Sequence, residues 1–139
     1  AQIPAVHPVN PDFPGIIIAE FTLPPERIDG VLTAKNTVVV SPGRLDRSPC
    51  GTGTSARMAV MHARGELAVG ERFIHKSIID STFDCRIEST TTVGSKDAIV
   101  PSVAGQAWIT DLTTVVVDPT DPYPLGYQIS DTYPKGYSV

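Results

Sequence analysis

The sequence predicts an α+β protein in which a mixed or antiparallel sheet wraps around one central helix. Two observations lead to this expectation. β-branched residues cluster in several short segments, and a proline-free segment of helix-forming residues lies between them, so strands are expected on both sides of the helix. The chain has 139 residues, which is enough for one domain with a sizeable core.

The expected strands lie between turn-forming residues, and several of their ends coincide with proline or glycine. They cover residues 15–23, 31–40, 98–103 and 107–117, with at least one more strand within residues 73–90. The run Val38-Val39-Val40 should be buried on both faces, because three apolar residues follow one another. Alternation of apolar and polar residues begins at Phe83, a turn is expected at residues 93–97, and Gly105 is expected at a bulge or bend.

The expected helix covers residues 54–64 and stops at Gly65. Apolar residues recur with helical spacing along it, at Ala56, Ala59, Val60, Ala63 and Leu67. This stripe is expected to be buried, and its alanines would let strands approach the helix closely. Met58 and Met61 add apolar surface on other sides, so the helix is expected to be buried on most of its faces.

The composition excludes several classes of protein. A net charge of −4 with 41% hydrophobic residues is not that of a disordered chain. No apolar run approaches the roughly 18 residues that a membrane-spanning helix needs, so no membrane is expected as a partner. The acidic balance and the lack of a basic cluster argue against nucleic acid as a partner.

The two cysteines, Cys50 and Cys85, do not make a disulfide framework, so a reducing compartment such as the cytoplasm is the simpler interpretation. No CxxC motif is present, and the histidines His7, His62 and His75 are scattered. This spacing is not that of a zinc site, and no metal is expected.

One segment has the properties of a site. Cys50 directly precedes the expected helix, where unsatisfied backbone N–H groups stabilise a nearby thiolate. Gly51 and Gly53 let a ligand approach the backbone, and the N–H groups of residues 51–54 could hold a carboxylate. Asp46, four residues before Cys50, could pair with an ammonium group. A thiol, a carboxylate cradle and an ammonium partner together fit an amino acid.

The segment Asp46-Arg47-Ser48-Pro49-Cys50-Gly51-Thr52-Gly53-Thr54-Ser55-Ala56-Arg57-Met58-Ala59 resembles the second active-site motif of the proline racemase family. That family includes hydroxyproline 2-epimerases and trans-3-hydroxyproline dehydratases. Segments elsewhere are also similar to the family: His7-Pro8-Val9-Asn10-Pro11, Ser41-Pro42-Gly43-Arg44-Leu45, Trp108-Ile109-Thr110 and residues 118–127. The resemblance therefore covers nearly the whole chain.

The resemblance implies a fold like that of diaminopimelate epimerase, in which two halves each wrap a sheet around a central helix and the active site lies between them. It implies that Cys50 is an acid/base facing the α-carbon of proline or hydroxyproline. Asp46 matches the residue that holds the ring nitrogen, and Gly51 and Thr52 match the residues whose N–H groups bind the carboxylate. Two opposed bases exchange the α-proton, and no cofactor is used.

The family's first motif, Met-Cys-Gly-His or a Ser-Gly-His variant, is absent from the sequence, so the chain resembles only the C-terminal half. We expect a linker-like segment at residues 1–14, a catalytic half-domain at 15–118, and a segment rich in proline and tyrosine at 119–139 that packs on the partner half. The missing N-terminal half is the expected partner, and a homodimer is a second way to complete the site. A cysteine at the facing position of that half would favour a racemase or epimerase, and a serine would permit an epimerase or a dehydratase. Cys50 itself argues against members with threonine at this position, which are dehydratases. A non-catalytic truncated half is the remaining alternative.

Several residues also have purely structural interpretations. Asp46 could be a turn residue. Cys85 is expected to pack in the core on an alternating strand, and its surroundings lack a glycine cradle. His62 is expected on a helix face, with a Cys–His hydrolase pairing to Cys50 as the alternative. His7 and His75 are expected at the surface or in loops.

Overall fold

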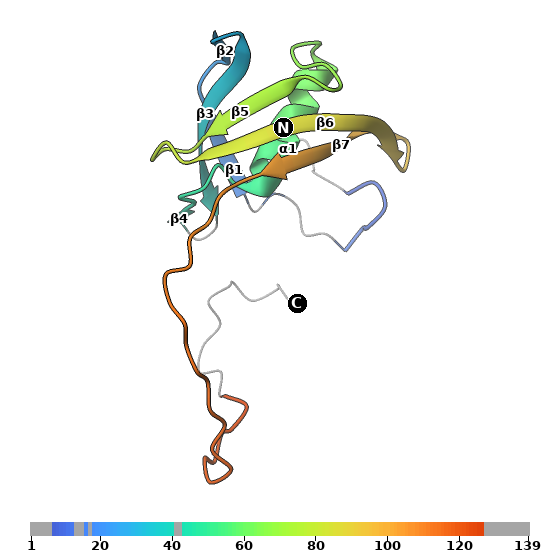
Figure 1. Ribbon diagram of the computed structural model, residues 1–139. Coiled ribbons are helices and arrows are strands. Elements are labelled where there is room, and N and C mark those ends of the chain that lie inside the picture. The colour runs from blue at the N-terminus through green and yellow to red at the C-terminus, as the bar shows by residue number, and fades with distance from the viewer. Residues whose placement is uncertain (1–6, 13–15, 17, 41–42, 127–139) are drawn as a thin grey trace. The chain divides into compact units, whose positions relative to one another are not determined.

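The computed structural model of the protein describes residues 7–12, 16, 18–40 and 43–126 (Figure 1). The chain divides into two compact units, residues 1–106 and 107–139. All regular elements of the described residues lie in the first unit. They are β1 (Ile18–Thr22), β2 (Glu26–Ile28), β3 (Val31–Val40), β4 (Arg44–Leu45), α1 (Gly51–Ala63), β5 (Arg72–Lys76), β6 (Thr82–Val93) and β7 (Lys96–Ala104).

The strands form a 7-stranded sheet whose main order is β1-β3-β5-β6-β7, and β2 and β4 also pair with β3. The long strand β3 is the organising element. It is antiparallel to β1, β2 and β4 but parallel to β5, with Leu32 opposite Phe73. A parallel pair needs a crossover connection, and the crossover between β3 and β5 contains α1. The start of α1 therefore follows β3 and β4 along the chain, and Gly53 in its first turn lies next to β3 and β1.

The sheet curves around α1, as the sequence predicts (Figure 1). At one side β7 packs against the helix, and at the other Val38 of β3 and Glu20 of β1 approach Gly53. The space between helix and sheet holds the hydrophobic core. Its buried members are Leu32, Ala34, Met58, Met61, Leu67, Phe73, Cys85 and Ile87.

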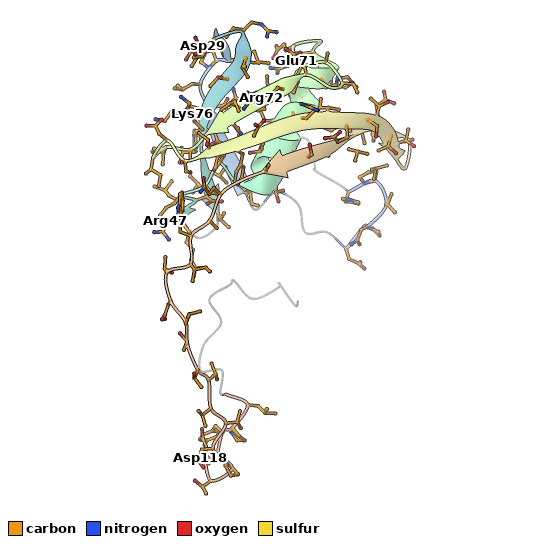
Figure 2. The ribbon with its side chains drawn as sticks, in the orientation of Figure 1. Asp29, Arg47, Glu71, Arg72, Lys76 and Asp118 are labelled. Carbon is orange, nitrogen blue, oxygen red and sulfur yellow. The ribbon has the colours of Figure 1, made fainter. Side chains whose placement is uncertain are left out.

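The outer surface of the sheet carries exposed ion pairs. Arg72 Nη2 lies 2.8 Å from Asp84 Oδ2, across the pairing of β5 with β6. Arg27 Nη2 lies 2.6 Å from Glu71 Oε1. Figure 2 shows Glu71 and Arg72 among the side chains that surround the sheet. Exposed pairs of this kind contribute little to stability, so the fold depends on the core beneath them.

The predicted buried stripe of the helix is wrong. Ala56, Val60 and Ala63 are exposed, whereas the buried face carries Gly53, Thr54, Arg57, Met58 and Met61. The polar side chains on this face are buried because they find hydrogen-bond partners on distant strands, which helical periodicity cannot reveal. Of the predicted stripe, Leu67 is buried, and it lies beyond the end of α1.

The predictions for four strand segments are confirmed with small changes. β1 lies within the strand expected at residues 15–23. Residues 31–40 are β3, residues 73–90 contain β5 and part of β6, and the strand expected at 98–103 lies within β7. The alternation after Phe83 is also observed. Val38 is fully buried, but Val39 and Val40 are only half-buried, so the expectation that all three are buried on both faces is wrong. The end of β3 is paired with the short strands β1 and β4.

The strand predicted at residues 107–117 is not present. These residues form no regular element, and their apolar side chains are exposed: Trp108, Ile109, Leu112, Val115, Val116 and Val117. A strand must pair its backbone groups with a neighbour, and no described strand pairs with this segment.

Gly105 follows the end of β7 and lies against Phe83, where an added Cβ would come within 2.7 Å of the ring. Because Gly105 has no Cβ, the ring of Phe83 can pack closely against its backbone. The bulge or irregularity of the sheet lies instead between Ile87 and Ser89.

The two ends of the chain are described only in part. Residues 7–12 form bends and a turn, in which Asn10 N donates to His7 Nδ1 at 2.9 Å. Of the tyrosines expected to pack in the C-terminal segment, Tyr123 is described and exposed, and Tyr127, Tyr133 and Tyr137 lie outside the described residues. No helix in the described ranges is long and apolar enough to span a membrane.

Candidate active site

The loop between β4 and α1 is organised by hydrogen bonds among its own residues. Asp46 Oδ1 accepts from both the backbone N–H and the hydroxyl of Ser48, each at 2.9 Å. Ser48 Oγ in turn accepts from the N–H of Cys50 at 3.0 Å. Asp46 thus acts as a turn residue that orients the approach to the helix. Its side chain is half-buried and remains the nearest carboxylate along the chain to Cys50.

Cys50 is the N-cap residue of α1, and it has an unusual backbone. Its φ is 63°, in a region that residues with a side chain seldom adopt. Its Sγ accepts from Gly53 N at 3.4 Å, so the thiol itself caps one of the free N–H groups of the helix. The residue is 9% exposed. The sulfur therefore lies against the N-terminal end of the helix, as expected from the sequence.

Gly51 and Thr52 are exposed residues, and their backbone N–H groups donate to no group within the described part of the chain. They lie next to Cys50 at the positive end of the helix, where an anion is stabilised. Gly51 has open space where a Cβ would lie, but at Gly53 a Cβ would be 3.1 Å from Val38 Cγ2. Gly53 therefore serves packing between helix and sheet, and Gly51 leaves room for a ligand.

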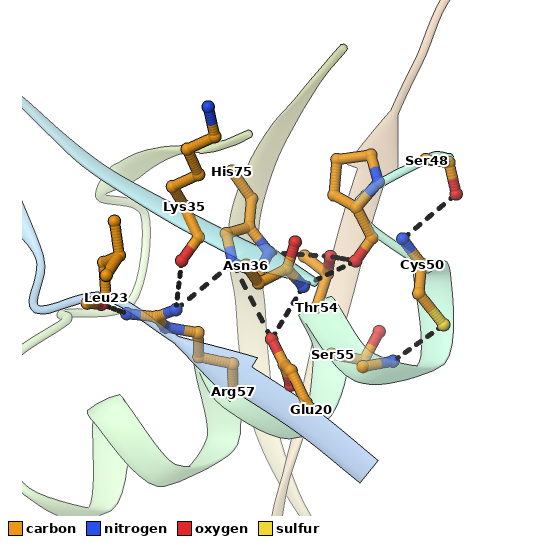
Figure 3. Close-up of polar contacts among 12 residues, drawn as sticks. Glu20, Leu23, Lys35, Asn36, Ser48, Cys50, Thr54, Ser55, Arg57 and His75 are labelled. Carbon is orange, nitrogen blue, oxygen red and sulfur yellow. Dashed lines mark hydrogen bonds and ion pairs between the residues drawn. The ribbon is translucent and has the colours of Figure 1, made fainter. Parts of the chain in front are cut away.

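Behind this loop lies a cluster of polar side chains, which we call the polar cluster (Figure 3). Its members come from β1, β3, α1 and β5, and they are Glu20, Asn36, Thr54, Arg57 and His75. Thr54 and His75 are fully buried, Asn36 is 3% exposed and Arg57 is 9% exposed. Buried polar groups of this kind must be satisfied by hydrogen bonds, and most of these are.

The hydrogen bonds of His75 determine its tautomer. Arg57 Nη1 lies 3.4 Å from Nε2 and can only donate, so Nε2 carries no proton. Nδ1 then carries the proton and donates to Thr54 Oγ1 at 2.9 Å, and Thr54 Oγ1 donates to Pro49 O at 3.2 Å. The bonds thus run in one direction, from Arg57 through His75 and Thr54 to the carbonyl group that precedes Cys50.

The electrostatics of the polar cluster keep His75 neutral. Burial, together with the positive charge of Arg57, lowers the pKa of His75 from 6.5 to about 4. Burial also raises the pKa of Glu20, against the opposing effects of the hydrogen bond from Asn36 and of the Arg57 charge. Glu20 Oε1 lies 3.7 Å from His75 Nε2, but this is no ion pair while the imidazole is neutral.

The expectation that His75 lies at the surface is therefore wrong. His75 is on β5, it is fully buried, and its ring centroid lies 5.1 Å from that of Phe73. The polar cluster could not be predicted from the sequence, because its members are far apart along the chain and only the sheet brings them together. The one available indication was the placement of Thr54 and Arg57 on one face of the helix with Met58 and Met61.

The remaining expectations for single residues agree with the structure. His7 is exposed. His62 lies near the end of α1 with Nδ1 2.9 Å from Leu67 O, and at about 1.5 Å per residue it is roughly 18 Å along the helix from Cys50. The alternative Cys–His pair with Cys50 is therefore excluded by geometry. Cys85 is a core residue, and burial raises the pKa of its thiol to about 12.

Within the described ranges, no three or more His, Cys, Asp or Glu side chains come together in a way that could hold a metal ion.

Comparison with known proteins identifies the family. The family model described as proline racemase matches residues 1–128. The chain belongs to the proline racemase family. Among solved structures, a probable proline racemase from Agrobacterium radiobacter K84, with bound carbonate, has 38% sequence identity and a TM-score of 0.71. A hydroxyproline epimerase from Agrobacterium vitis, with bound trans-4-hydroxy-L-proline, has 35% identity and a TM-score of 0.70.

These family members confirm the predicted fold class, an α+β fold like that of diaminopimelate epimerase with a sheet around a central helix. The alignments cover 92% and 96% of this chain but only 36% and 38% of the two solved chains. The chain therefore spans little more than a third of the length of these relatives.

Proposed function

We propose that this chain is the Cys50-bearing half of an epimerase or racemase that acts at the α-carbon of hydroxyproline or proline. In this proposal residues 15–118 form the catalytic half-domain, residues 119–139 pack on the partner half, and the missing N-terminal half completes the site. The observation that carries the proposal is the start of α1. There a cysteine thiol lies at the helix start next to two exposed residues, Gly51 and Thr52, whose N–H groups are unpaired within the described part of the chain.

The arrangement supports a division of roles. The N–H groups of Gly51 and Thr52 bind the substrate carboxylate, because the helix end favours an anion there. Asp46 pairs with the ammonium of the ring nitrogen. Cys50 then takes the α-proton from one face as a thiolate, or returns it as a thiol, while a base from the other half acts on the opposite face. Two side chains complete this proton exchange, so the proposal needs no cofactor.

The substrate class rests on the family and on one of its members. The similar structure from Agrobacterium vitis is named a hydroxyproline epimerase and holds trans-4-hydroxy-L-proline. Both cysteines of this chain are free thiols, which fits a protein of the reducing cytoplasm. The alternatives are a trans-3-hydroxy-L-proline dehydratase, if the completing half supplies a serine, and a non-catalytic half. A homodimer is a second way to supply the opposing face.

We expect pyrrole-2-carboxylate to compete with the substrate in the completed enzyme, and to bind better than proline. The pyrrole ring is planar at the carbon that corresponds to the α-carbon, so it resembles the deprotonated substrate rather than the tetrahedral ground state. Competition in the epimerisation assay measures this difference. Weaker binding of the pyrrole than of proline would contradict a planar intermediate at this site.

The role of Asp46 is tested by Asp46→Asn, because asparagine keeps an oxygen for Ser48 but loses the negative charge. We expect kcat/KM for hydroxyproline to fall about tenfold to a hundredfold, the usual cost of losing a charge-assisted hydrogen bond. The matched control is Asp97→Asn, at an exposed position of β7. Unchanged turnover in Asp46→Asn would reduce Asp46 to its observed turn role.

A further inference from the structure

The peptide group between Pro49 and Cys50 is held at both of its ends. Its oxygen accepts two hydrogen bonds, from Asn36 Nδ2 at 2.8 Å and from Thr54 Oγ1 at 3.2 Å. Its N–H donates to Ser48 Oγ at 3.0 Å. On the other side of Cys50, the carbonyl oxygen accepts from Thr54 N at 2.8 Å, which is the first bond of the helix. Both peptide planes next to Cys50 are therefore fixed.

These hydrogen bonds are unusual because they hold the backbone of Cys50 in an unfavourable conformation. A residue other than glycine at a φ of 63° is strained by about 1–3 kcal/mol, and such strain persists only where the surroundings enforce it. Rotation of Cys50 to a negative φ would move its Cβ and carry Sγ away from Gly53 N. It would also turn the Pro49 carbonyl away from Asn36 and Thr54. The buried donors then oppose relaxation, because each would lose its acceptor.

We propose that Asn36 and Thr54 are positioning residues for Cys50. Through the Pro49 carbonyl they hold the Cys50 backbone in its strained conformation, and this places the thiol at the N-terminal end of α1. This role rests on the proposed function of Cys50. His75 and Arg57 support this positioning role by fixing the hydrogen bonds of the Thr54 hydroxyl. Arg57 donates to the backbone oxygens of Leu23 and Lys35 and lies against His75 Nε2, so the proton on Nδ1 always points at Thr54. The Thr54 hydroxyl therefore accepts from His75 and donates its own hydrogen to the Pro49 oxygen.

Asn36 connects the same carbonyl to β1. One hydrogen of its Nδ2 points at Pro49 O and the other at Glu20 Oε1, each with a nitrogen–oxygen distance of 2.8 Å. The orientation of the amide is therefore determined, because a flipped amide would place its oxygen against both acceptors. The position of the loop is thus tied to two strands of the sheet as well as to α1.

The test compares Thr54→Val, which keeps the shape and loses the hydroxyl, with Thr54→Ser, which keeps the hydroxyl and loses a methyl group. In the completed enzyme we expect Thr54→Val to lower kcat about tenfold with less than a twofold change in KM, because one hydrogen bond is worth roughly this factor. Thr54→Ser should retain kcat even though losing a buried methyl lowers its stability. The control is Thr90→Val, on an exposed position of β6.

A second readout does not depend on catalysis. Labelling cysteine with ¹⁵N marks only Cys50 and Cys85, and a positive φ gives a strong nuclear Overhauser effect between the amide and α protons of the same residue. We expect this effect at Cys50 in the unmodified chain and in Thr54→Ser, and a weaker one in Thr54→Val. Ser48→Ala, at a half-buried loop position, should weaken it in the same way and serves if Thr54→Val does not fold.

The outcomes separate this proposal from the proposed function. An unchanged nuclear Overhauser effect at Cys50 in both Thr54→Val and Ser48→Ala would overturn the positioning role, whatever the turnover of these variants. A weakened effect with an unchanged kcat would also overturn it, while leaving the epimerase proposal intact. If the unmodified completed enzyme shows no turnover, the proposed function fails, and the backbone measurement alone decides whether these residues hold Cys50.

Discussion

Cys50→Ala should abolish epimerisation by the completed enzyme. A single acid–base group contributes typically about 10²–10⁴-fold to a rate. We expect a loss at or beyond the upper end of that range, because inversion requires a proton to be exchanged on the face that Cys50 serves. The measurement is the rate of conversion of hydroxyproline between its α-epimers, followed by chiral chromatography.

The control for this prediction is Cys85→Ala, which removes the other thiol of the chain. Cys85 packs in the core with Phe73 and Ile87, so its loss should lower the free energy of unfolding but leave turnover per folded molecule unchanged. Turnover within tenfold of the unmodified enzyme in Cys50→Ala would contradict the assignment of Cys50. Such a result would favour a non-catalytic role for this chain.

The stability of the chain should fall between pH 7.5 and pH 5 by about 2 kcal/mol, owing to His75 alone. The pKa of His75 is about 4 in the folded chain and 6.5 in the unfolded chain, because burial and the Arg57 charge oppose protonation. Below pH 6.5 the unfolded chain therefore binds a proton that the folded chain does not. The contribution is fully present above pH 6.5 and is lost as the pH falls toward 4.

Glu20 acts in the opposite direction at the acid end of this range. Its pKa is raised in the folded chain, so the folded chain takes up that proton more readily than the unfolded chain as the pH falls. Urea unfolding at the two pH values measures the net change. His75→Gln should be less stable at pH 7.5 but should lose much of the pH dependence, and His7→Gln should keep it. Equal pH dependence in the unmodified chain and in His75→Gln would show that His75 is not held neutral.

Local patterns were sufficient to predict most of the secondary structure of the first unit. The run of β-branched residues at 31–40 and the alternation after Phe83 each depend on neighbours along the chain, and both are strands. The position of Cys50 at the helix start was predictable for the same reason, since glycines and a helix-forming segment follow it directly.

Features that depend on distant partners were not predictable in this way. Thr54 and Arg57 occupy the buried face of α1 because His75 and Glu20 lie opposite them, and the spacing of alanines pointed to the other face. Residues 107–117 have the composition of a strand, but a strand forms only where a neighbour pairs with it, and the described residues supply none. The positive φ of Cys50 likewise could not be inferred from its type, because the side chains bonded to the adjacent Pro49 carbonyl, Asn36 and Thr54, come from β3 and α1.

Solvent deuterium at the α-carbon tests the central claim most directly. Hydroxyproline is incubated in deuterium oxide with this chain alone, with a polypeptide that carries the missing Cys-Gly-His or Ser-Gly-His motif, and with both together. Because inversion needs an acid/base on each face of the α-carbon, we expect deuterium in the inverted epimer only in the mixture, and none there when the chain carries Cys50→Ala. Formation of the deuterated inverted epimer at a comparable rate by this chain alone would contradict this expectation, and would mean that one chain or its dimer supplies both faces.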